Sequence, residues 1–506
     1  MAKFYLTTSI AYVNSVPHVG FALECIQADA LARYNKLKGN EVFFLTGTDE
    51  HGVKIFDTAK GLNRDPKEYV DEISSRYLDL KSLLNLTNDD FIRTSSDRHK
   101  VGAKALWTKL IESGDIYKNF YEGLYCVGCE AFILEKDLDA EGNCPIHKKA
   151  PKPIKEENYF FRLSKYSDKI KELIEKDQLL ILPKNRKKEM INLIGDGLND
   201  VSFSRPKTSL TWGVDVPDDP DHVMYVWCDA LTNYISALGY GTEKTDLFEK
   251  YWPCDAHMLG KDILRFHATI WIGMLLSAGV ELPKSILVHG YVTSEGQKMS
   301  KSLGNVVDPF SYVEKYGADA LRYYLLREIP TADDGDFTHS SFVEIFNSEL
   351  ANNLGNLLNR VLMMSERYMN AEVKEITDAG EIYAFLEEKV KKYDELFMGF
   401  DYRGAAELVL EILNFANKYI DDKKPWSMAK TGDMKDVQKV LYELIEIVKF
   451  AAVLLVPFIP QSAYSILNQL SVEEKNVSFD LLKWGTVKSG TKLKREEKVL
   501  FPRLEE

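Results

Sequence analysis

Residues 3–46 read KFYLTTSIAYVNSVPHVGFALECIQADALARYNKLKGNEVFFLT. The runs 3–9 and 41–46 are rich in apolar, β-branched and aromatic residues, which is typical of β-strands. Between them, apolar residues recur at helical spacing, at Phe21, Ile26, Ala30, Leu31 and Tyr34. A strand–helix–strand unit of this length takes a right-handed crossover, so its two strands are parallel members of one sheet. The stretch therefore predicts an α/β fold.

The alternation of strands and helices continues beyond this stretch and ends before the C-terminal segment. Alternation resumes after Val223, with a helix at 227–238, a strand ending at Gly260, a helix to Ala278 and a strand at 285–289. Cysteines and prolines interrupt it before that point. We therefore expect a doubly wound, Rossmann-like domain in two halves, an insertion between them, and an all-α bundle. The four segments are 1–116 (first half), 117–225 (insertion), 226–341 (second half) and 342–506 (helical).

Composition limits the classes of protein that fit. A chain of 506 residues exceeds one core and suggests about three domains. The most apolar stretch, 450–460, is short and interrupted by proline, so it predicts a buried helix rather than a membrane span. The N-terminus has no signal-peptide pattern, and we expect a cytoplasmic protein. The net charge of −13 disfavours a nucleic-acid partner only weakly, because a local basic surface is enough to bind a polyanion. The basic run 184–188 is one candidate for such a surface, although it could equally be a solvated face.

Chemically active residues follow four predicted strands. The segments are 14–20, 47–52, 260–262 and 290–302, and they hold glycines, acids, histidines and lysines. Ligands of doubly wound sheets bind outside the carboxyl ends of the strands. We therefore expect these four segments to share one crevice.

Two of these segments have properties that suit a nucleotide phosphate. His18 and Gly20 precede a helix, whose free N–H groups attract phosphate, although His18 could equally be packed in a turn. Lys298 and Lys301 lie in a glycine-flanked loop and could neutralise a triphosphate, although a solvated loop is the commoner outcome. The chain has no Walker-type glycine loop, which disfavours γ-phosphate hydrolysis.

The other segments suit an amino acid. Asp49 could pair with a substrate ammonium group or simply cap a helix. Aromatic residues flank the same loops, namely Tyr12, Trp227, Tyr234, Phe266 and Trp271. A thioether packs well against aromatic rings, but an ordinary aromatic core explains these residues equally well.

Four residues form two pairs with metal-ligand spacing. Cys126 and Cys129 are one pair, and Cys144 and His147 are the other. Three thiolates and one imidazole suit tetrahedral zinc. Because all four positions are filled by protein, we expect one structural Zn²⁺. The remaining cysteines are scattered and are expected to be reduced core thiols.

Two motifs resemble the paired motifs of class I aminoacyl-tRNA synthetases. The segment His18-Val19-Gly20-Phe21 resembles their "HIGH" element, and residues 298–302 match their "KMSKS" element letter for letter. Phe21 replaces the second histidine and cannot donate a hydrogen bond. The resemblance implies catalytic roles for His18, Lys298 and Lys301. It also implies attack of an amino-acid carboxylate on the α-phosphate of ATP, with Mg²⁺ on the phosphates, followed by transfer to the terminal ribose of tRNA.

Further stretches resemble the methionyl-tRNA synthetases, at 10–14, 226–230, 260–267 and 289–293. The resemblance implies a single zinc knuckle folded over the active site, an insertion too short for editing, L-methionine as substrate and tRNA(Met) with a CAU anticodon as partner. Leu231 stands where some relatives have proline. The implied methionine site is Ile10, Tyr12, Asp49, Trp227, Ala230, Leu231, Tyr234, Ile263, Phe266 and His267. The implied ATP site is Gly20, Glu24, Gly260 and Asp262 with Lys298 and Lys301, and the implied anticodon readers are Asn356, Arg360 and Trp426.

We also expect a monomer, because the sequence ends at Glu506 without the dimerising domain of some relatives. Three alternatives stay open. The first is a class I synthetase for cysteine, isoleucine or valine. The second is a nucleotidylyltransferase, for which the helical segment has no obvious use. The third is a tRNA-binding paralogue without activity, which Phe21 favours and the intact 298–302 motif disfavours.

Overall fold

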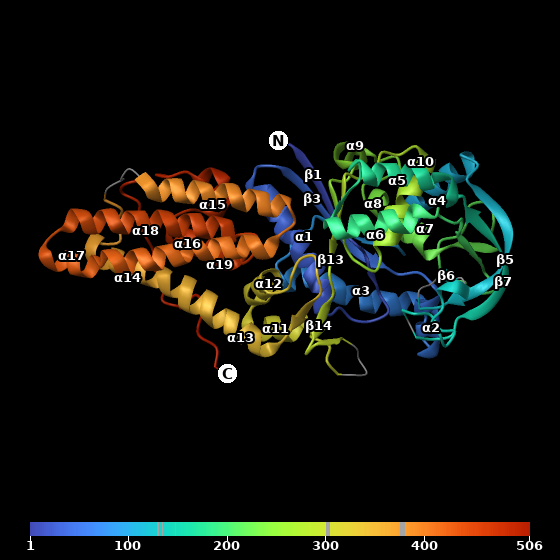
Figure 1. Ribbon diagram of the computed structural model, residues 1–506, viewed down its shortest axis with the longest axis horizontal. Coiled ribbons are helices and arrows are strands. Elements are labelled where there is room, and N and C mark those ends of the chain that lie inside the picture. Colours follow the sequence, from blue (N-terminus) through green and yellow to red (C-terminus); the bar gives the residue numbers. More distant parts are fainter. Residues whose placement is uncertain (129–130, 134, 147, 300–303, 375–379, 506) are drawn as a thin grey trace.

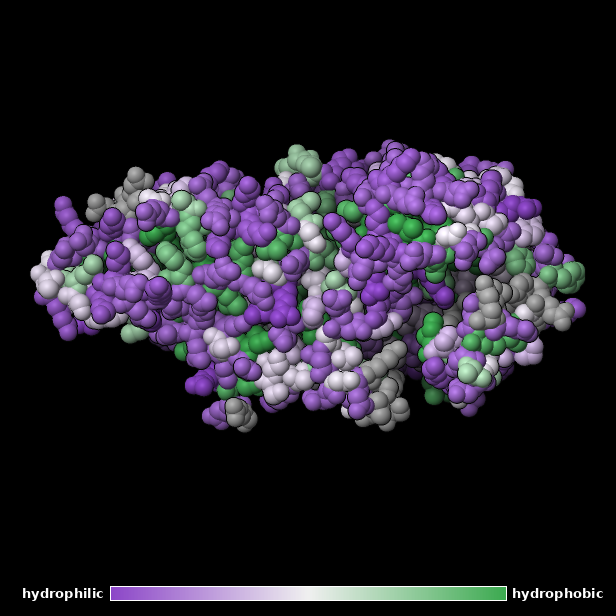
Figure 2. Space-filling model, in the orientation of Figure 1, coloured by the Kyte–Doolittle hydropathy of each residue, from purple (hydrophilic) through white to green (hydrophobic). Residues whose placement is uncertain are grey.

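The computed structural model describes residues 1–128, 131–133, 135–146, 148–299, 304–374 and 380–505. Figure 1 shows an elongated molecule with its sheets at one end and long helices at the other. On the face shown in Figure 2, hydrophilic residues dominate and apolar residues occur in separate areas. Within the described ranges, no helix combines the length and the apolar character that a membrane crossing needs.

The main sheet has seven strands, and all of its pairings are parallel. The strand order is β2-β3-β1-β12-β13-β8, and β4 also pairs with β3. The strands are β1 (Lys3–Thr8), β2 (Ala11–Tyr12), β3 (Glu41–Asp49), β4 (Asp90–Arg93), β8 (Leu180–Leu182), β12 (Ala256–Gly260) and β13 (Ser285–His289). Helix α1 (Val19–Leu37) connects β1 to β3. The predicted βαβ unit is therefore confirmed.

Strand β1 lies where the winding of the sheet changes direction. Its neighbours are β3 on one side and β12 on the other, so the chain builds outward from β1 twice. In such sheets the crevice for ligands opens outside the carboxyl ends of the strands at this point. The fold therefore places the residues after β1, β3, β12 and β13 around one opening.

Helices surround the main sheet, and their ends follow from the local sequence. Helix α3 begins where Asp65 accepts hydrogen bonds from the N–H groups of Lys67 and Glu68, with Pro66 as the first helical residue. Asp308 and Pro309 begin α11 in the same way. Besides α1 and the helices after residue 225 described next, this region contains α2 (Val53–Gly61), α3 (Pro66–Leu83), α4 (Asp97–Glu112), α5 (Ser167–Glu175), α6 (Lys184–Gly195), α9 (Asp246–Tyr251), α11 (Pro309–Tyr316) and α12 (Ala318–Arg327).

Two predicted helices are interrupted. The helix expected at 227–238 is split into α7 (Val226–Leu231) and α8 (Asn233–Ser236). The Thr232 hydroxyl donates to Cys228 O and the Asn233 amide donates to Ala230 O, so these side chains compete for helical carbonyls. The helix expected to reach Ala278 consists of a π-helical segment, η3 (Phe266–Trp271), and α10 (Ile272–Ala278). Such π-helical segments often mark functional sites.

The segment expected to be an insertion forms a sheet of its own and also contributes to the main one. Strands β6 (Ala131–Ile133), β5 (Ile116–Cys126), β7 (Lys152–Phe161) and β9 (Val201–Ser202) form an antiparallel sheet in that order. Strand β8, however, pairs with β13 at the edge of the main sheet. The range 117–225 thus includes a main-sheet strand, which an apolar run of three residues does not reveal in sequence. A hairpin of β10 (Ser204–Pro206) and β11 (His222–Met224) follows β9.

A small sheet leads from the main domain toward the helices. It consists of β15 (Gln297–Lys298), β14 (Val292–Ser294) and β16 (Gly335–Phe337). Beyond it, the described part of the chain has helices and turns but no named strand. The helical elements are α13 (His339–Ile345), the π-helical η4 (Phe346–Gly355), α14 (Asn356–Met369), α15 (Gly380–Met398), α16 (Tyr402–Lys423), α17 (Pro425–Thr431), α18 (Met434–Leu455) and α19 (Pro460–Gln469). Two short 3-10 helices follow, η5 (Glu474–Asn476) and η6 (Phe479–Leu482).

Helix α18 is the core of this bundle. Nearly all of its residues from Val437 to Leu455 are buried, and it packs against α14, α16, α17 and α19. The apolar stretch 450–460 ends α18 and turns into α19, so the predicted buried helix is confirmed.

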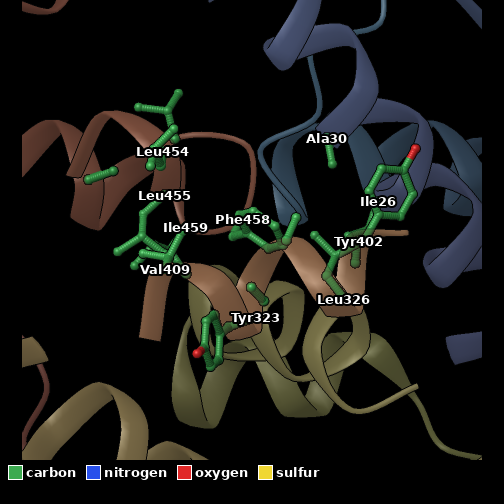
Figure 3. Packing of buried hydrophobic residues seen from close by; sticks show 14 of the residues in the cluster. Ile26, Ala30, Tyr323, Leu326, Tyr402, Val409, Leu454, Leu455, Phe458 and Ile459 are labelled. Atoms are coloured by element: carbon green, nitrogen blue, oxygen red, sulfur yellow. The ribbon is translucent and has the colours of Figure 1, made fainter. Parts of the chain in front are cut away.

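The bundle packs on α1 and α12 through a buried interface. Figure 3 shows Ile26 and Ala30 of α1 near Leu326 of α12 and Phe458 of the turn after α18. Arg322 of α12, which is fully buried, pairs with Asp29 of α1 at 2.7 Å and donates to the carbonyls of Pro457 and Phe458. These carbonyls follow a helix C-terminus, where a cation is favourable. One guanidinium group therefore connects both parts of the molecule.

Candidate active site

The carboxyl ends of the main-sheet strands surround a cavity of about 500 Å³. This volume lies in the usual range for small-molecule sites. Fourteen of the residues singled out in the sequence line it: Ile10, Tyr12, His18, Gly20, Glu24, Asp49, Trp227, Ala230, Leu231, Tyr234, Gly260, Asp262, Ile263 and His267. The expected convergence of separate strand ends on one crevice is confirmed.

The N-terminus of α1 forms one wall of the cavity. His18 is the N-cap residue, and its Nδ1 accepts a hydrogen bond from the backbone N–H of Gly20 at 3.0 Å. The neutral ring therefore carries its proton on Nε2, which remains able to donate. The ring is open to solvent at the mouth of the cavity, yet the surrounding protein buries it enough to lower the pKa of His18. A Cβ at Gly20 would lie 2.8 Å from His18 Cε1, so a larger residue here would displace the His18 ring.

The segment containing the second motif approaches the same helix end. Met299 lines the cavity, and its Cε would lie 3.9 Å from a Cβ at Gly20. Past the motif, Val307 O accepts a hydrogen bond from Val19 N at the start of α1. Residues 300–303, including Lys301, lie outside the described residues, as does the side chain of Lys298. The phosphate roles of both lysines stay predictions.

Phe21 packs where the second histidine of the first motif is expected. Its ring meets Tyr77 of α3 edge to face at 5.1 Å between centroids, and both residues line the cavity. The Tyr77 hydroxyl donates to Ser15 O at 3.1 Å, which ties α3 to the loop before α1. The replacement thus exchanges a hydrogen-bond donor for aromatic packing.

Glu24 connects two strand ends across the cavity. Its Oε1 accepts hydrogen bonds from Ser9 N at 2.7 Å and Ser9 Oγ at 2.6 Å. Its Oε2 lies 2.9 Å from His289 Nε2, while His289 Nδ1 faces Gly290 O at 2.7 Å. Burial alone would lower the pKa of His289, but the hydrogen bond and charge of Glu24, with smaller contributions from Gly290 and Asp262, raise it. Both ring nitrogens face oxygen acceptors, an arrangement that favours the protonated form of His289.

Aromatic rings form the opposite wall. Trp227 of α7 and Phe266 of η3 stack with their centroids 3.9 Å apart. Trp227 lines the cavity, whereas Phe266 lies behind it and supports it. The Tyr234 hydroxyl lies 2.7 Å from His267 Nε2, and His267 Nδ1 lies 3.0 Å from Ile263 O. Burial lowers the pKa of His267 to about 4, so the neutral ring donates to Ile263 O and accepts from Tyr234.

The chain is fixed directly after Asp49, the last residue of β3. The next residue, Glu50, is fully buried and accepts from Arg93 Nε at 2.6 Å and Ser74 Oγ at 2.5 Å. The backbone O of Glu50 accepts from Trp212 Nε1 at 2.6 Å. The Asp49 carboxylate is therefore carried into the cavity by an anchored backbone.

Several cavity residues were not singled out as site residues in the sequence: Ser9, Tyr77, Gly128, Asn233, His289, Tyr291 and Met299. Ser9 directly follows β1 and His289 ends β13, so both could have been found by the strand-end rule. Tyr77 comes from the middle of an ordinary amphipathic helix, and its sequence carries no signal of this role.

The cysteine pairs are described only in part. Cys126 and Cys144 are both buried, as thiolate ligands of a closed metal site should be, while Cys129 and His147 lie outside the described residues. Cys126 ends β5 opposite Ala131 of β6, and the turn residue Gly128, two positions after Cys126, lines the cavity. Two of the four candidate ligands lie outside the described residues, and the described residues contain no group of three potential metal ligands. The zinc site therefore stays a prediction, and the burial of Cys126 and Cys144 is consistent with it.

The expected anticodon readers lie at the far end of the helical bundle. Asn356 is exposed at the start of α14, and Arg360 follows one helical turn later. Trp426 of α17 is 36% exposed, and its ring lies 6.0 Å from the Arg360 guanidinium carbon. Figure 1 shows α17 at the end of the molecule opposite β5 and β7. The three residues share one exposed region, and their role stays a prediction.

Two known families match the chain. The family described as "tRNA synthetases class I (M)" matches residues 4–152 and 136–362. The family described as "Anticodon binding domain of methionyl tRNA ligase" matches residues 372–506.

Curated relatives and solved structures agree with these matches. Methionine–tRNA ligase of Thermotoga maritima is 43% identical over 97% of this chain and 78% of its own length. The enzyme of the same name from Rickettsia conorii is 42% identical over 99% of both chains. The structure of Mycobacterium tuberculosis methionyl-tRNA synthetase in complex with methionyl-adenylate superimposes with a TM-score of 0.94, at 39% identity, covering 99% of this chain and 100% of that one. The apo form of that synthetase gives a TM-score of 0.88 at 36% identity, covering 100% and 99%.

Proposed function

Because the chain belongs to the methionyl-tRNA synthetases of class I, we propose that the cavity at the strand ends is where methionine is joined to ATP. The activity is that of a methionine–tRNA ligase: methionine and ATP give methionyl-adenylate and pyrophosphate, and methionine then passes to tRNA with release of AMP. The observation that supports this location is the convergence of four strand ends on one cavity.

The first step needs position and charge rather than a protein base. A carboxylate oxygen of methionine attacks the α-phosphorus of ATP, and the bond to the bridging oxygen of pyrophosphate breaks. The nucleophile is already an anion, so catalysis consists of aligning the two substrates and stabilising the developing charge. In this proposal His18 Nε2–H and the first N–H groups of α1 bind phosphate oxygens. Lys298 and Lys301 neutralise the leaving pyrophosphate. Mg²⁺, when bound to the phosphates of ATP, would supply further charge neutralisation.

The methionine pocket follows from the rings and the acid around it. Asp49 pairs with the substrate ammonium group. Trp227, supported by Phe266, and Tyr234 offer ring surfaces to the thioether, which sulfur contacts favour. Leu231 is 1% exposed and fills the position where some relatives have proline. Gly260 and Asp262, with Gly20 and Glu24, are assigned to the ATP side of the cavity.

In the second step the terminal ribose hydroxyl of tRNA attacks the carbonyl carbon of the adenylate, and AMP leaves. We assign the anticodon of tRNA, with sequence CAU, to the exposed region of Asn356, Arg360 and Trp426. Single-stranded bases are commonly read by stacking on rings and guanidinium planes, and the contact of Arg360 with Trp426 provides both. We also predict that the protein is a monomer, which light scattering would check.

The zinc proposal rests on the donor set. Cys126, Cys129, Cys144 and His147 would hold one ion with no open position, so the metal would stiffen the knuckle and take no part in the chemistry. Because Gly128 lines the cavity, a stiff knuckle would also define its rim.

Pyrophosphate exchange across a panel of amino acids tests the proposal. Methionine alone should support rapid exchange of labelled pyrophosphate into ATP. Faster exchange with cysteine, isoleucine or valine would identify another synthetase. Exchange that needs no amino acid would favour a nucleotidylyltransferase, and the absence of exchange with retained tRNA binding would favour the inactive paralogue.

A further inference from the structure

A buried acid–imidazole cluster lies directly behind the methionine pocket. Asp229 of α7 is fully buried, and each of its oxygens contacts a different histidine. Oδ2 lies 2.6 Å from His51 Nδ1, and Oδ1 lies 2.7 Å from His99 Nε2. The second nitrogen of His99 lies 2.9 Å from the hydroxyl of Ser236.

Each member of this cluster belongs to a different element. His51 follows β3, His99 lies on α4, Asp229 on α7 and Ser236 on α8. All four residues are at most 2% exposed. His51 and His99 are 178 and 130 residues from Asp229 along the chain, so the cluster joins three segments that no local interaction connects. Trp212 also packs on the cluster: its ring meets the His51 ring edge to face, with 5.3 Å between the ring centroids.

The cluster connects the two halves of the proposed methionine site. His51 stands two residues after Asp49, which is assigned to the substrate ammonium group. Asp229 stands between Trp227 and the pair Ala230 and Leu231, which are assigned to the substrate side chain. None of the cluster residues lines the cavity, so they cannot touch the substrate themselves.

We infer that Asp229 is a positioning residue that fixes α7 against the loop after β3, and so sets the spacing between the ammonium-binding acid and the side-chain pocket. The inference rests on the proposed function, because it takes the assigned roles of Asp49 and Trp227 as given. A methionine molecule must meet both groups at once, so a small shift of α7 weakens its binding. The ATP side of the cavity is built from α1 and β12, and the hydrogen bonds and ion pairs of the Asp229 side chain go to neither of them.

The substitution Asp229→Asn tests this inference because it keeps the shape of the side chain. Asparagine has one oxygen acceptor, so it can accept from only one of the two histidines. In pyrophosphate exchange, the KM for methionine should rise about tenfold or more, as expected for a misplacement below 1 Å. The KM for ATP should stay within about twofold and kcat within about threefold. Equilibrium dialysis with labelled methionine should show the same loss of affinity without turnover.

A matched control separates positioning from general stability. Glu446 of α18 forms an equally buried pair with Lys449 at 2.7 Å, in the helical bundle and outside the cavity. Glu446→Gln should lower the unfolding temperature and leave both KM values unchanged. Should Asp229→Asn fail to fold, His51→Gln removes one arm of the cluster and should raise the KM for methionine selectively.

A folded Asp229→Asn or His51→Gln protein with an unchanged KM for methionine would overturn the inference, as would an equal rise in both KM values. Failure of the unaltered chain to exchange pyrophosphate with methionine would count against the proposed function instead.

Discussion

Replacing Arg322 by methionine should cost about 3–5 kcal/mol of folding free energy, the range for breaking a buried ion pair. Arg322 is fully buried, pairs with Asp29 and donates to the carbonyls of Leu84, Pro457 and Phe458. Removing it leaves three buried carbonyls with one partner fewer, at about 1 kcal/mol each. Asp29 would keep Arg33 and Thr87 as partners, which limits the electrostatic part of the loss.

The same helix offers a matched control. Arg327 of α12 also pairs with acids, but its side chain is 15% exposed and one partner, Glu407, is 48% exposed. Solvent screens such pairs, so Arg327→Met should cost about 1 kcal/mol or less. Both variants replace arginine by methionine, so the difference between their losses of folding free energy reports the effect of burial.

Urea unfolding followed by circular dichroism measures both variants. Because Arg322 joins α1 to the turn between α18 and α19, its loss should also separate unfolding of the helical bundle from that of the sheet domain, giving two transitions. A loss below about 1 kcal/mol for Arg322→Met, with a single transition, would refute the view that this guanidinium group holds the two parts together.

Four further predictions concern the site and its surroundings. Lys301→Ala should reduce methionine-dependent pyrophosphate exchange by about two orders of magnitude or more with an unchanged unfolding temperature, and near-normal exchange would remove its phosphate role. Trp426→Ala should spare that exchange and weaken charging of tRNA with a CAU anticodon, measured as kcat/KM, and equal loss of both activities would contradict an anticodon role. Elemental analysis should find about one zinc per chain, lost in Cys126→Ser, and a metal-free wild-type protein would exclude the knuckle. Burial lowers the pKa of His267 to about 4, so between about pH 4 and 6.5 the unfolded chain binds a proton that the folded one does not, and stability rises with pH there. His267→Gln should flatten that slope by up to about 1.4 kcal/mol per pH unit, and an unchanged slope would show that His267 is protonated in the folded protein.

The sequence predicts those parts of the fold that periodicity determines. The βαβ unit of β1, α1 and β3 follows from two apolar runs and one helical stripe, and the strand-end rule then locates the cavity. The helical bundle follows from the almost wholly helical pattern of the sequence after residue 342. These features are local, so residues a few positions apart suffice to predict them.

What the sequence does not show depends on partners far along the chain. Asp229 and His51 are in contact although they are 178 residues apart. Tyr34 of α1 and Phe397 of α15, also distant in sequence, stack with 4.6 Å between their ring centroids. No periodicity marks such pairs. The break between α7 and α8 arises because Thr232 and Asn233 bind the helix's own carbonyls, a competition that helix propensity alone does not decide. The three residues of β8 are too short a run to signal a strand.

Helix α1 has a fixed function at each end, and this constrains its length. It begins at His18 in the cavity wall and ends beside the bundle, where Tyr34 and Lys38 meet Asp394 of α15. Its 19 residues span roughly 28 Å, and each residue turns the axis by about 100°. Inserting or deleting a single residue would rotate one end out of register with the other, however conservative the residue. Natural variation in this helix should therefore consist of substitutions, and its residue count should stay constant wherever both attachments are kept.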